Sequence, residues 1–194
     1  TGMSGNKVSL NGDVENSSNI SAKESINVKK IENTGNVSTA SSLHINESLN
    51  NSGNIQANSE IEVANNLKNN GSIKSLDSIS INGNVNNDGE ILTNKNFIAK
   101  DVVSSKTLIA KENISVSNLN NTGAVATEKK LEINGSLENK GKIQAIEDIK
   151  ISENANNSGS ILTNSKFSSK DLRNTNELKA NKEISVKNLE NTGN

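Results

Sequence analysis

The fold is decided by a short phrase that recurs along the whole chain. It reads LNNSGNI at residues 49–55 and LNNTGAV at residues 119–125. Related phrases, separated by whole 17- or 18-residue repeats, begin near Ile31, Leu67, Val85, Leu137, Ala155 and Leu189. A fixed period this short indicates one supersecondary unit stacked many times. Such a stack forms a long, rigid surface more readily than it forms a catalytic pocket.

Each repeat carries apolar or small residues at fixed offsets. An aliphatic residue opens the repeat, a small residue follows two positions later, and a large apolar residue stands six positions after the start. Two positions after the large residue stands another residue, usually apolar. A third aliphatic residue stands three or four positions after that one. The opening residues are Ile20, Val37, Ile55, Ile73, Ile91, Leu108, Val125, Ile143, Ile161 and Leu178. A partial repeat with Val8, Leu10 and Val14 precedes them.

The spacing of two within these sets is the period of a β-strand and not of a helix. Segments such as Ile61-Glu62-Val63 and Ile79-Ser80-Ile81 are bounded by runs of Asn, Ser, Gly and Lys, which are typical of bends. Equivalent strands of successive repeats can pair only as parallel neighbours. The sequence therefore predicts an all-β fold, a parallel β-helix of about ten 17–18-residue coils, roughly 48 Å long at about 4.8 Å per coil.

The handedness of the coil follows from a general rule. Connections between parallel strands of one sheet are nearly always right-handed, which favours a right-handed β-helix. A left-handed β-helix is the alternative, because 18 is three times six and aliphatic residues recur at six. The 17-residue coils break that hexad, and the small residue follows the large one by two positions where the left-handed pattern places it two before.

Asparagine and glycine mark one bend of each coil. Two positions after the third aliphatic residue stand Asn33, Asn51, Asn69, Asn87, Asn121, Asn139, Asn157, Asn174 and Asn191, with Ser104 as the exception. Stacked Asn side chains can form hydrogen bonds along the axis of a coil. Two positions further on stand Gly35, Gly53, Gly71, Gly89, Gly123, Gly141, Gly159 and Gly193, which predicts a backbone with positive φ at this bend. Ser18, Lys106 and Asn176 break that rule, and Lys106 fits it least.

The coil lengths repeat at a second level. Counted from Ile55, successive lengths are 18, 18, 17 and 17, and the same order starts again at Val125. The missing residue falls between the second and third strands of a coil. We interpret residues 55–124 and 125–194 as copies of a 70-residue unit within a single β-helical segment, 1–194. Residues 1–7 are expected to be a cloning remnant or a frayed end, and the chain to be a piece of a longer repetitive protein.

The composition excludes several classes of function. The chain has no Cys, so it has neither disulfides nor thiolate metal sites. The net charge is −1 with Lys and acidic residues interspersed, which argues against a nucleic-acid surface or a polybasic membrane patch. No apolar run approaches the length of a membrane helix, and no signal peptide is visible.

Candidate catalytic residues are few. His44 is the only His, and strand alternation between Leu43 and Ile45 points it outward, so we predict a solvated surface residue without a metal or triad role. Asp101 and Asp171 recur four coils apart, roughly 19 Å, which is too far for paired acid–base catalysis. Arg173 has Val103 at its equivalent position. We therefore predict no catalytic, cofactor-binding or metal-binding residue, no cofactor and no small-molecule substrate.

Two further sets of residues are predicted to face the core. Phe97 and Phe167, the only aromatic residues, occupy the column of large apolar residues and are expected to be buried and not to be sugar platforms. The threonines of the small-residue column are also predicted to point inward, which argues against an ice-binding face. They are Thr39, Thr93, Thr127 and Thr163.

The repeat pattern Leu-x-Asn-x-Gly-x-Ile-x-Ala-x-x-x-Ile-x-Val, clearest at residues 49–63 and 137–151, resembles the repeats of the filamentous haemagglutinin family. That family comprises large bacterial exoproteins secreted by the two-partner route, including contact-dependent growth-inhibition exoproteins. The resemblance covers nearly all of the chain. It implies a secreted or cell-surface shaft, an outer-membrane two-partner secretion transporter as the partner of the parent protein, and no catalytic residues.

The sequence and the resemblance together lead to one main expectation. The chain is expected to be a non-enzymatic structural shaft of an adhesin or of a toxin-delivery protein, which extends a distal domain from the cell. The alternative is a repeat surface that itself binds a host receptor, a glycan or a neighbouring bacterial surface. A carbohydrate-active enzyme is a remote third reading, since no long loop or acid cluster interrupts the coils.

Overall fold

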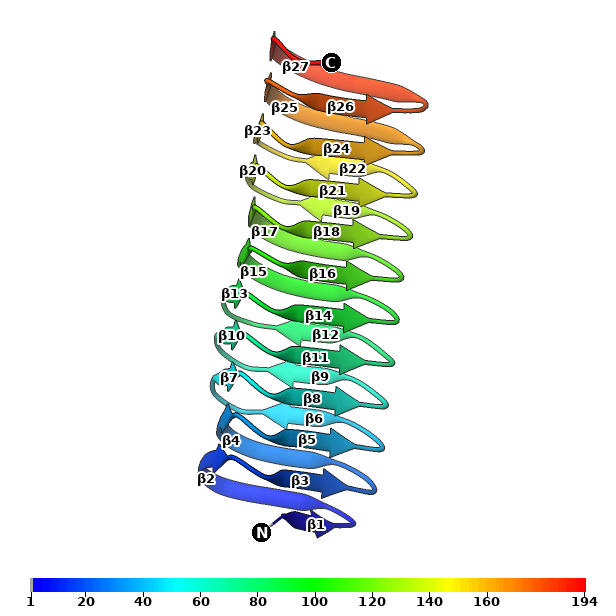
Figure 1. Ribbon diagram of the computed structural model, residues 1–194. Helices are drawn as coiled ribbons and strands as arrows, with labels where there is room; N and C mark the ends of the chain where they lie inside the picture. Colours follow the sequence, from blue (N-terminus) through cyan, green and yellow to red (C-terminus); the bar gives the residue numbers. More distant parts are fainter. Residues whose placement is uncertain (1) are drawn as a thin grey trace.

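The computed structural model describes residues 2–194, which form a rod of stacked coils (Figure 1). The described residues contain 27 strands and no helix, and every strand pairing is parallel, which confirms the predicted parallel β-helix. In Figure 1 the nearer strands run to the right, the fainter and more distant strands run to the left, and the chain climbs from N to C. This progression is a right-handed coil.

One strand from each coil belongs to an eleven-stranded sheet, here the first sheet. Its central residues are the opening aliphatics, paired in strict register: Ile55 lies beside Ile73, and Ile73 beside Ile91. The strands are β1 (Met3–Gly5), β3 (Asn19–Ala22), β5 (Asn36–Thr39), β8 (Asn54–Ala57), β11 (Ser72–Ser75), β14 (Glu90–Thr93), β16 (Thr107–Ala110), β18 (Ala124–Thr127), β21 (Lys142–Ala145), β24 (Ser160–Thr163) and β26 (Glu177–Ala180).

The other strands form a sixteen-stranded second sheet. In some coils one long strand contains both apolar pairs: β2 (Val8–Asn16), β4 (Ile26–Asn33), β15 (Phe97–Ser104), β17 (Ile114–Asn121), β25 (Lys166–Asn174) and β27 (Glu183–Asn191). In the rest two short strands replace it: β6 (Leu43–Ile45) and β7 (Leu49–Asn51), β9 (Ile61–Val63) and β10 (Leu67–Asn69), β12 (Ile79–Ile81) and β13 (Val85–Asn87), β19 (Leu131–Ile133) and β20 (Leu137–Asn139), β22 (Ile149–Ile151) and β23 (Asn154–Asn157).

The coil length decides between these two forms. In an 18-residue coil the second and third strands are separated by a turn, as between β12 and β13. Removing one residue at this point lets the strand continue through the bend, as in β15. The order of broken and continuous strands seen from β9 to β17 therefore returns from β19 to β27.

The partial repeat at the N-terminus forms an eleventh coil. Strand β1 pairs in register with β3, so residues 3–5 belong to the first sheet, while Thr1 lies outside the described residues. Strand β2 pairs with β4 through a β-bulge between Leu10 and Asp13. The structure thus has eleven coils where the sequence predicts about ten and a partial repeat, because a strand without the repeat's aliphatic pattern still pairs with its neighbour.

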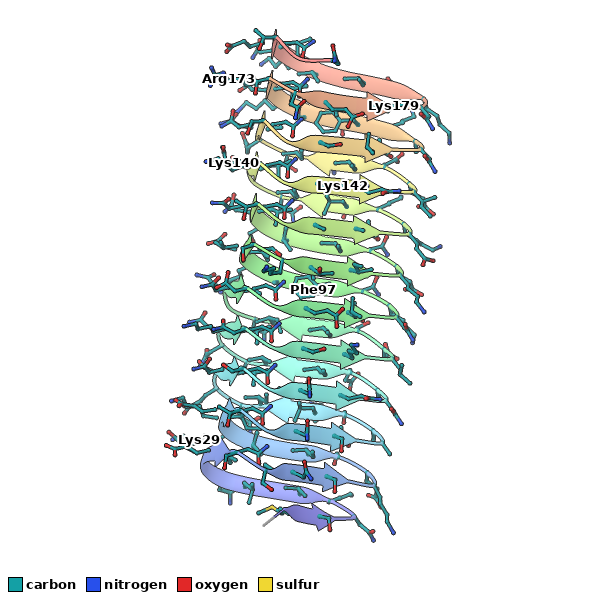
Figure 2. The ribbon with its side chains drawn as sticks, viewed as in Figure 1. Lys29, Phe97, Lys140, Lys142, Arg173 and Lys179 are labelled. Atoms are coloured by element: carbon teal, nitrogen blue, oxygen red, sulfur yellow. The ribbon has the colours of Figure 1, made fainter. Side chains whose placement is uncertain are left out.

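The core is a set of aliphatic columns inside the coil. The opening aliphatic residues from Ile20 to Ile161 are at most 4% exposed, and Phe97 and Phe167 are fully buried, as predicted. Figure 2 shows Phe97 within the rod, whereas Lys29, Lys140 and Arg173 point outward along one edge. Each coil buries too little apolar surface to fold alone, so stability comes from the interfaces between neighbouring coils.

Buried asparagines form the predicted ladder along the axis. The Nδ2 group of Asn51 donates to Oδ1 of Asn69 at 2.9 Å, and Asn33 donates to Asn51 at 2.8 Å. The same bond links most successive coils from Asn16 to Asn191. Each Nδ2 group also reaches the bend, as Asn51 does at the carbonyl oxygens of Gly53 and Ser72. The ladder therefore gives hydrogen-bond partners to the buried carboxamides, which would otherwise destabilise the fold.

Ser104 shortens the ladder at one position. Its Oγ accepts a hydrogen bond from Nδ2 of Asn87 at 3.2 Å. Within residues 2–194, its hydroxyl makes no hydrogen bond to the side chain of Asn121. Replacing Ser104 with Asn should raise the free energy of unfolding by about 1 kcal/mol, because a new amide bond would join the two halves of the ladder. Asn174 stands at the equivalent place in a 17-residue coil and bonds to both neighbours, so the geometry admits Asn. Urea denaturation measures the change; an equal or lower midpoint would contradict it.

The glycines of the bend correct one prediction. No described residue has positive φ, so the expected left-handed backbone is wrong. Glycine is required instead by close stacking: a Cβ built on Gly71 would lie 2.1 Å from the carbonyl oxygen of Gly53 in the coil below. The neighbouring glycines are crowded in the same way, at 2.0–2.2 Å. Lys106 and Asn176 stand at this place without glycine, and their N–H groups have no partner among residues 2–194, whereas Gly71 donates to Asn51.

The inward threonines bind the bend of the preceding coil. Their hydroxyls donate to backbone carbonyl oxygens one coil below, as Thr93 does to Asp77 and Thr127 to Glu112. Their burial confirms that this column faces inward. Each threonine hydroxyl thus bonds to the adjacent coil, which an alanine in the same column cannot do.

Among residues 2–194, Ser169 is the one buried polar side chain without a hydrogen-bond partner. It occupies the position filled by Ala99 in the equivalent coil, and its buried Oγ has no hydrogen bond within residues 2–194. Ser169→Ala should stabilise the protein by about 1 kcal/mol, because an unsatisfied hydroxyl is costly to bury. The matched control is Ser168→Ala, on the outward side of the same strand, which should leave the thermal midpoint unchanged. A lower midpoint for Ser169→Ala would show that the hydroxyl is satisfied.

Candidate functional surface

His44 lies on the outer face of β6, as predicted from strand alternation. Its Nδ1 lies 2.9 Å from Oε2 of Glu62 in the next coil, and its Nε2 lies 2.8 Å from Oγ of Ser42. The side chain is 31% exposed. A shallow hollow of about 400 Å³ surrounds the pair and is lined also by Ser80 and Asn82. The carboxylate of Glu62 can hold the imidazole in one orientation while its other nitrogen contacts the hydroxyl of Ser42, so the three side chains stand in the order of a Ser–His–acid arrangement on the outer surface.

The two recurrent aspartates have separate partners. Asn118 donates to Asp101 at 2.7 Å, and Asn188 donates to Asp171 at 2.5 Å, each from the coil above. Arg173 lies 3.3 Å from Glu190 in an exposed ion pair. The structure does not bring Asp101, Asp171 and His44 together, since they lie on different coils and strands. Within residues 2–194, no group of three or more His, Asp or Glu side chains is placed to hold a metal ion.

Ion pairs cross between coils over the outer surface. Lys95 lies 2.7 Å from Asp77, and Lys170 lies 2.8 Å from Glu153. The hydrogen bond from Lys95 lowers the pKa of Asp77 from its ordinary value. Such exposed pairs contribute little to stability, because water and salt screen the two charges. These ion pairs give the outer surface interspersed positive and negative charges, in agreement with the net charge of −1.

A larger hollow runs along the outer side of the third strands. It measures about 550 Å³ and crosses the coils from Lys30 and Glu32 to Asp101 and Val103, with Asn50, Lys68 and Asn86 along its length. The coils between its ends are of the 18-residue form and carry the extra turn. This groove was not predicted from the sequence, although the three consecutive 18-residue coils are a signal that could have indicated it.

Comparisons with known proteins identify no relative. No family model, curated protein or solved structure matches the chain. Among residues 2–194 no helix is both long and apolar enough to cross a membrane.

Proposed function

We propose that this chain is a stiff, non-enzymatic spacer that holds other parts of a larger protein at a fixed distance. The observation that carries the proposal is the unbroken register of the first sheet through eleven coils. Core columns and the asparagine ladder tie each coil to the next, so bending requires breaking many bonds at once. At about 4.8 Å per coil the rod is about 50 Å long.

The charges of the outer surface favour the function of a spacer rather than that of a binding module. Its Lys side chains form ion pairs with Asp and Glu side chains of neighbouring coils, and its one histidine is paired with Glu62. Such a surface provides solubility without a concentrated field that would attract nucleic acid or an anionic membrane.

The resemblance of the repeats to the filamentous haemagglutinin family suggests a cellular setting for this spacer. On that basis the rod belongs to a large bacterial exoprotein, secreted or at the cell surface, exported by an outer-membrane two-partner transporter. Its distal domain would be an adhesive module or a toxin. The rod would then increase the reach of that domain toward a host cell or a neighbouring bacterium.

A second candidate function rests on the groove along the third strands. Its 550 Å³ hollow and its row of outward Asn and Lys side chains would suit an extended receptor segment or glycan. In that case the shaft itself would be the adhesive surface.

Binding of the purified chain to host cells and to neighbouring bacteria separates the two functions. The spacer predicts a signal no higher than that of a charge-matched control protein. Saturable binding would overturn the spacer as the sole role. Lys68→Glu, in the middle of the groove, would then abolish binding if the groove is the site, whereas Lys140→Glu, outside the lining of that groove, would leave it unchanged.

A further inference from the structure

Two turns of the rod share an Asn–Gly dipeptide at the same place. Asn82-Gly83 follows β12, and Asn134-Gly135 follows β19, between the second and third strands of 18-residue coils. Both asparagines are exposed. Their own backbone N–H groups are bonded alike, to Val63 and Val116 respectively, at 2.9 Å. The two turns are therefore a matched pair within one chain.

The glycine amides of these turns differ. Gly135 donates its N–H to the carbonyl oxygen of Ser117 at 2.7 Å. Gly83 has no hydrogen-bond partner for its N–H among residues 2–194. Gly135 stacks on the continuous strand β17, whereas Gly83 stacks on the turn at Asn65 and Asn66 of another 18-residue coil.

We propose that Asn82 is a site of spontaneous deamidation, favoured over Asn134. The backbone nitrogen of Gly83 attacks the side-chain carboxamide carbon of Asn82, its proton leaves, and ammonia is expelled from a cyclic imide. Water then opens the imide to aspartate or isoaspartate, so that the net change is amide plus water to acid plus ammonia. Gly83 has no side chain to crowd the ring, and its nitrogen breaks no protein hydrogen bond to react.

The modification would change the hollow around His44. Asn82 lines that hollow together with Glu62, and the reaction adds a second carboxylate to it. The rod would thus acquire negative charge at one defined coil as it ages, without any enzyme.

The test follows both sites during incubation of the folded chain at mildly alkaline pH. Trypsin separates them, because Asn82 falls in residues 75–95 and Asn134 in residues 131–140. Fragmentation mass spectrometry then measures the exchange of the amide for an acid at each residue. We expect Asn82 to react about five- to tenfold faster than Asn134 in the folded protein, the effect of one hydrogen bond. In urea the two rates should converge.

Equal rates in the folded protein, or faster reaction at Asn134, would overturn the proposal. The Asn82→Gln variant provides a control for assignment, since acid formation in residues 75–95 should fall to background. Persistent modification of that peptide would place the reaction at another of its asparagines and would also contradict the proposal.

Discussion

Gly71→Ala should destabilise the rod by about 3 kcal/mol, as expected for a side chain forced into a packed interior. The added Cβ would lie 2.1 Å from the carbonyl oxygen of Gly53 and 2.7 Å from the carbonyl carbon of Ser52, both backbone atoms that cannot rotate away. The coils must separate, which weakens the bond from Ser72 to Gly53. Urea denaturation followed by circular dichroism measures the loss.

Two variants make this prediction specific. Gly12→Ala is the matched control, because nothing lies within 4 Å of its Cβ position, and it should change stability by less than about 0.5 kcal/mol. Gly71→Asn distinguishes crowding from a left-handed backbone, which Asn tolerates better than Ala. Crowding predicts that Asn is at least as harmful as Ala at this position; a milder effect of Asn would point to positive φ.

Asn51→Ala should cost about 3 kcal/mol, because alanine would leave the amides of both neighbours with one bond fewer and open a cavity between them. Asn51 is fully buried, and its side chain bonds to Asn33 and Asn69 and to the bend at Gly53. The measurement is the same urea midpoint.

The adjacent residue supplies the control. Asn50 is also an asparagine of β7 but faces outward, so Asn50→Ala should change stability by less than about 0.5 kcal/mol. Equal losses for the two variants would mean that the ladder contributes nothing beyond ordinary strand packing. A ladder-specific effect requires the inward variant alone to be destabilised.

The architecture of this chain was predictable because the pattern repeats. A single Ile-x-Val segment could belong to many β-folds, but its return at every 17- or 18-residue step leaves parallel stacking as the solution. The inward Asn column was predictable for the same reason. Phe97 and Phe167 were assigned to the core by their place in a column of aliphatic residues, and they are buried.

Other features depend on how neighbouring coils meet. The role of the bend glycines was misread because positive φ and close stacking both select glycine, and only the distance to the coil below distinguishes them. The pairing of His44 with Glu62 depends on two side chains of successive coils sharing one column. The difference between Gly83 and Gly135 lies in one backbone hydrogen bond to the coil beneath, which the identical Asn–Gly dipeptides do not indicate.

The distance between two spin labels along the rod tests the account most directly. The chain has no Cys, so Ser38→Cys and Lys179→Cys introduce unique labelling sites. These residues lie in one outward column of the first sheet, eight register steps apart. A stiff rod predicts one narrow distance distribution centred near about 38 Å. A broad distribution, or a second shorter distance, would show a flexible chain of coils and would contradict the spacer.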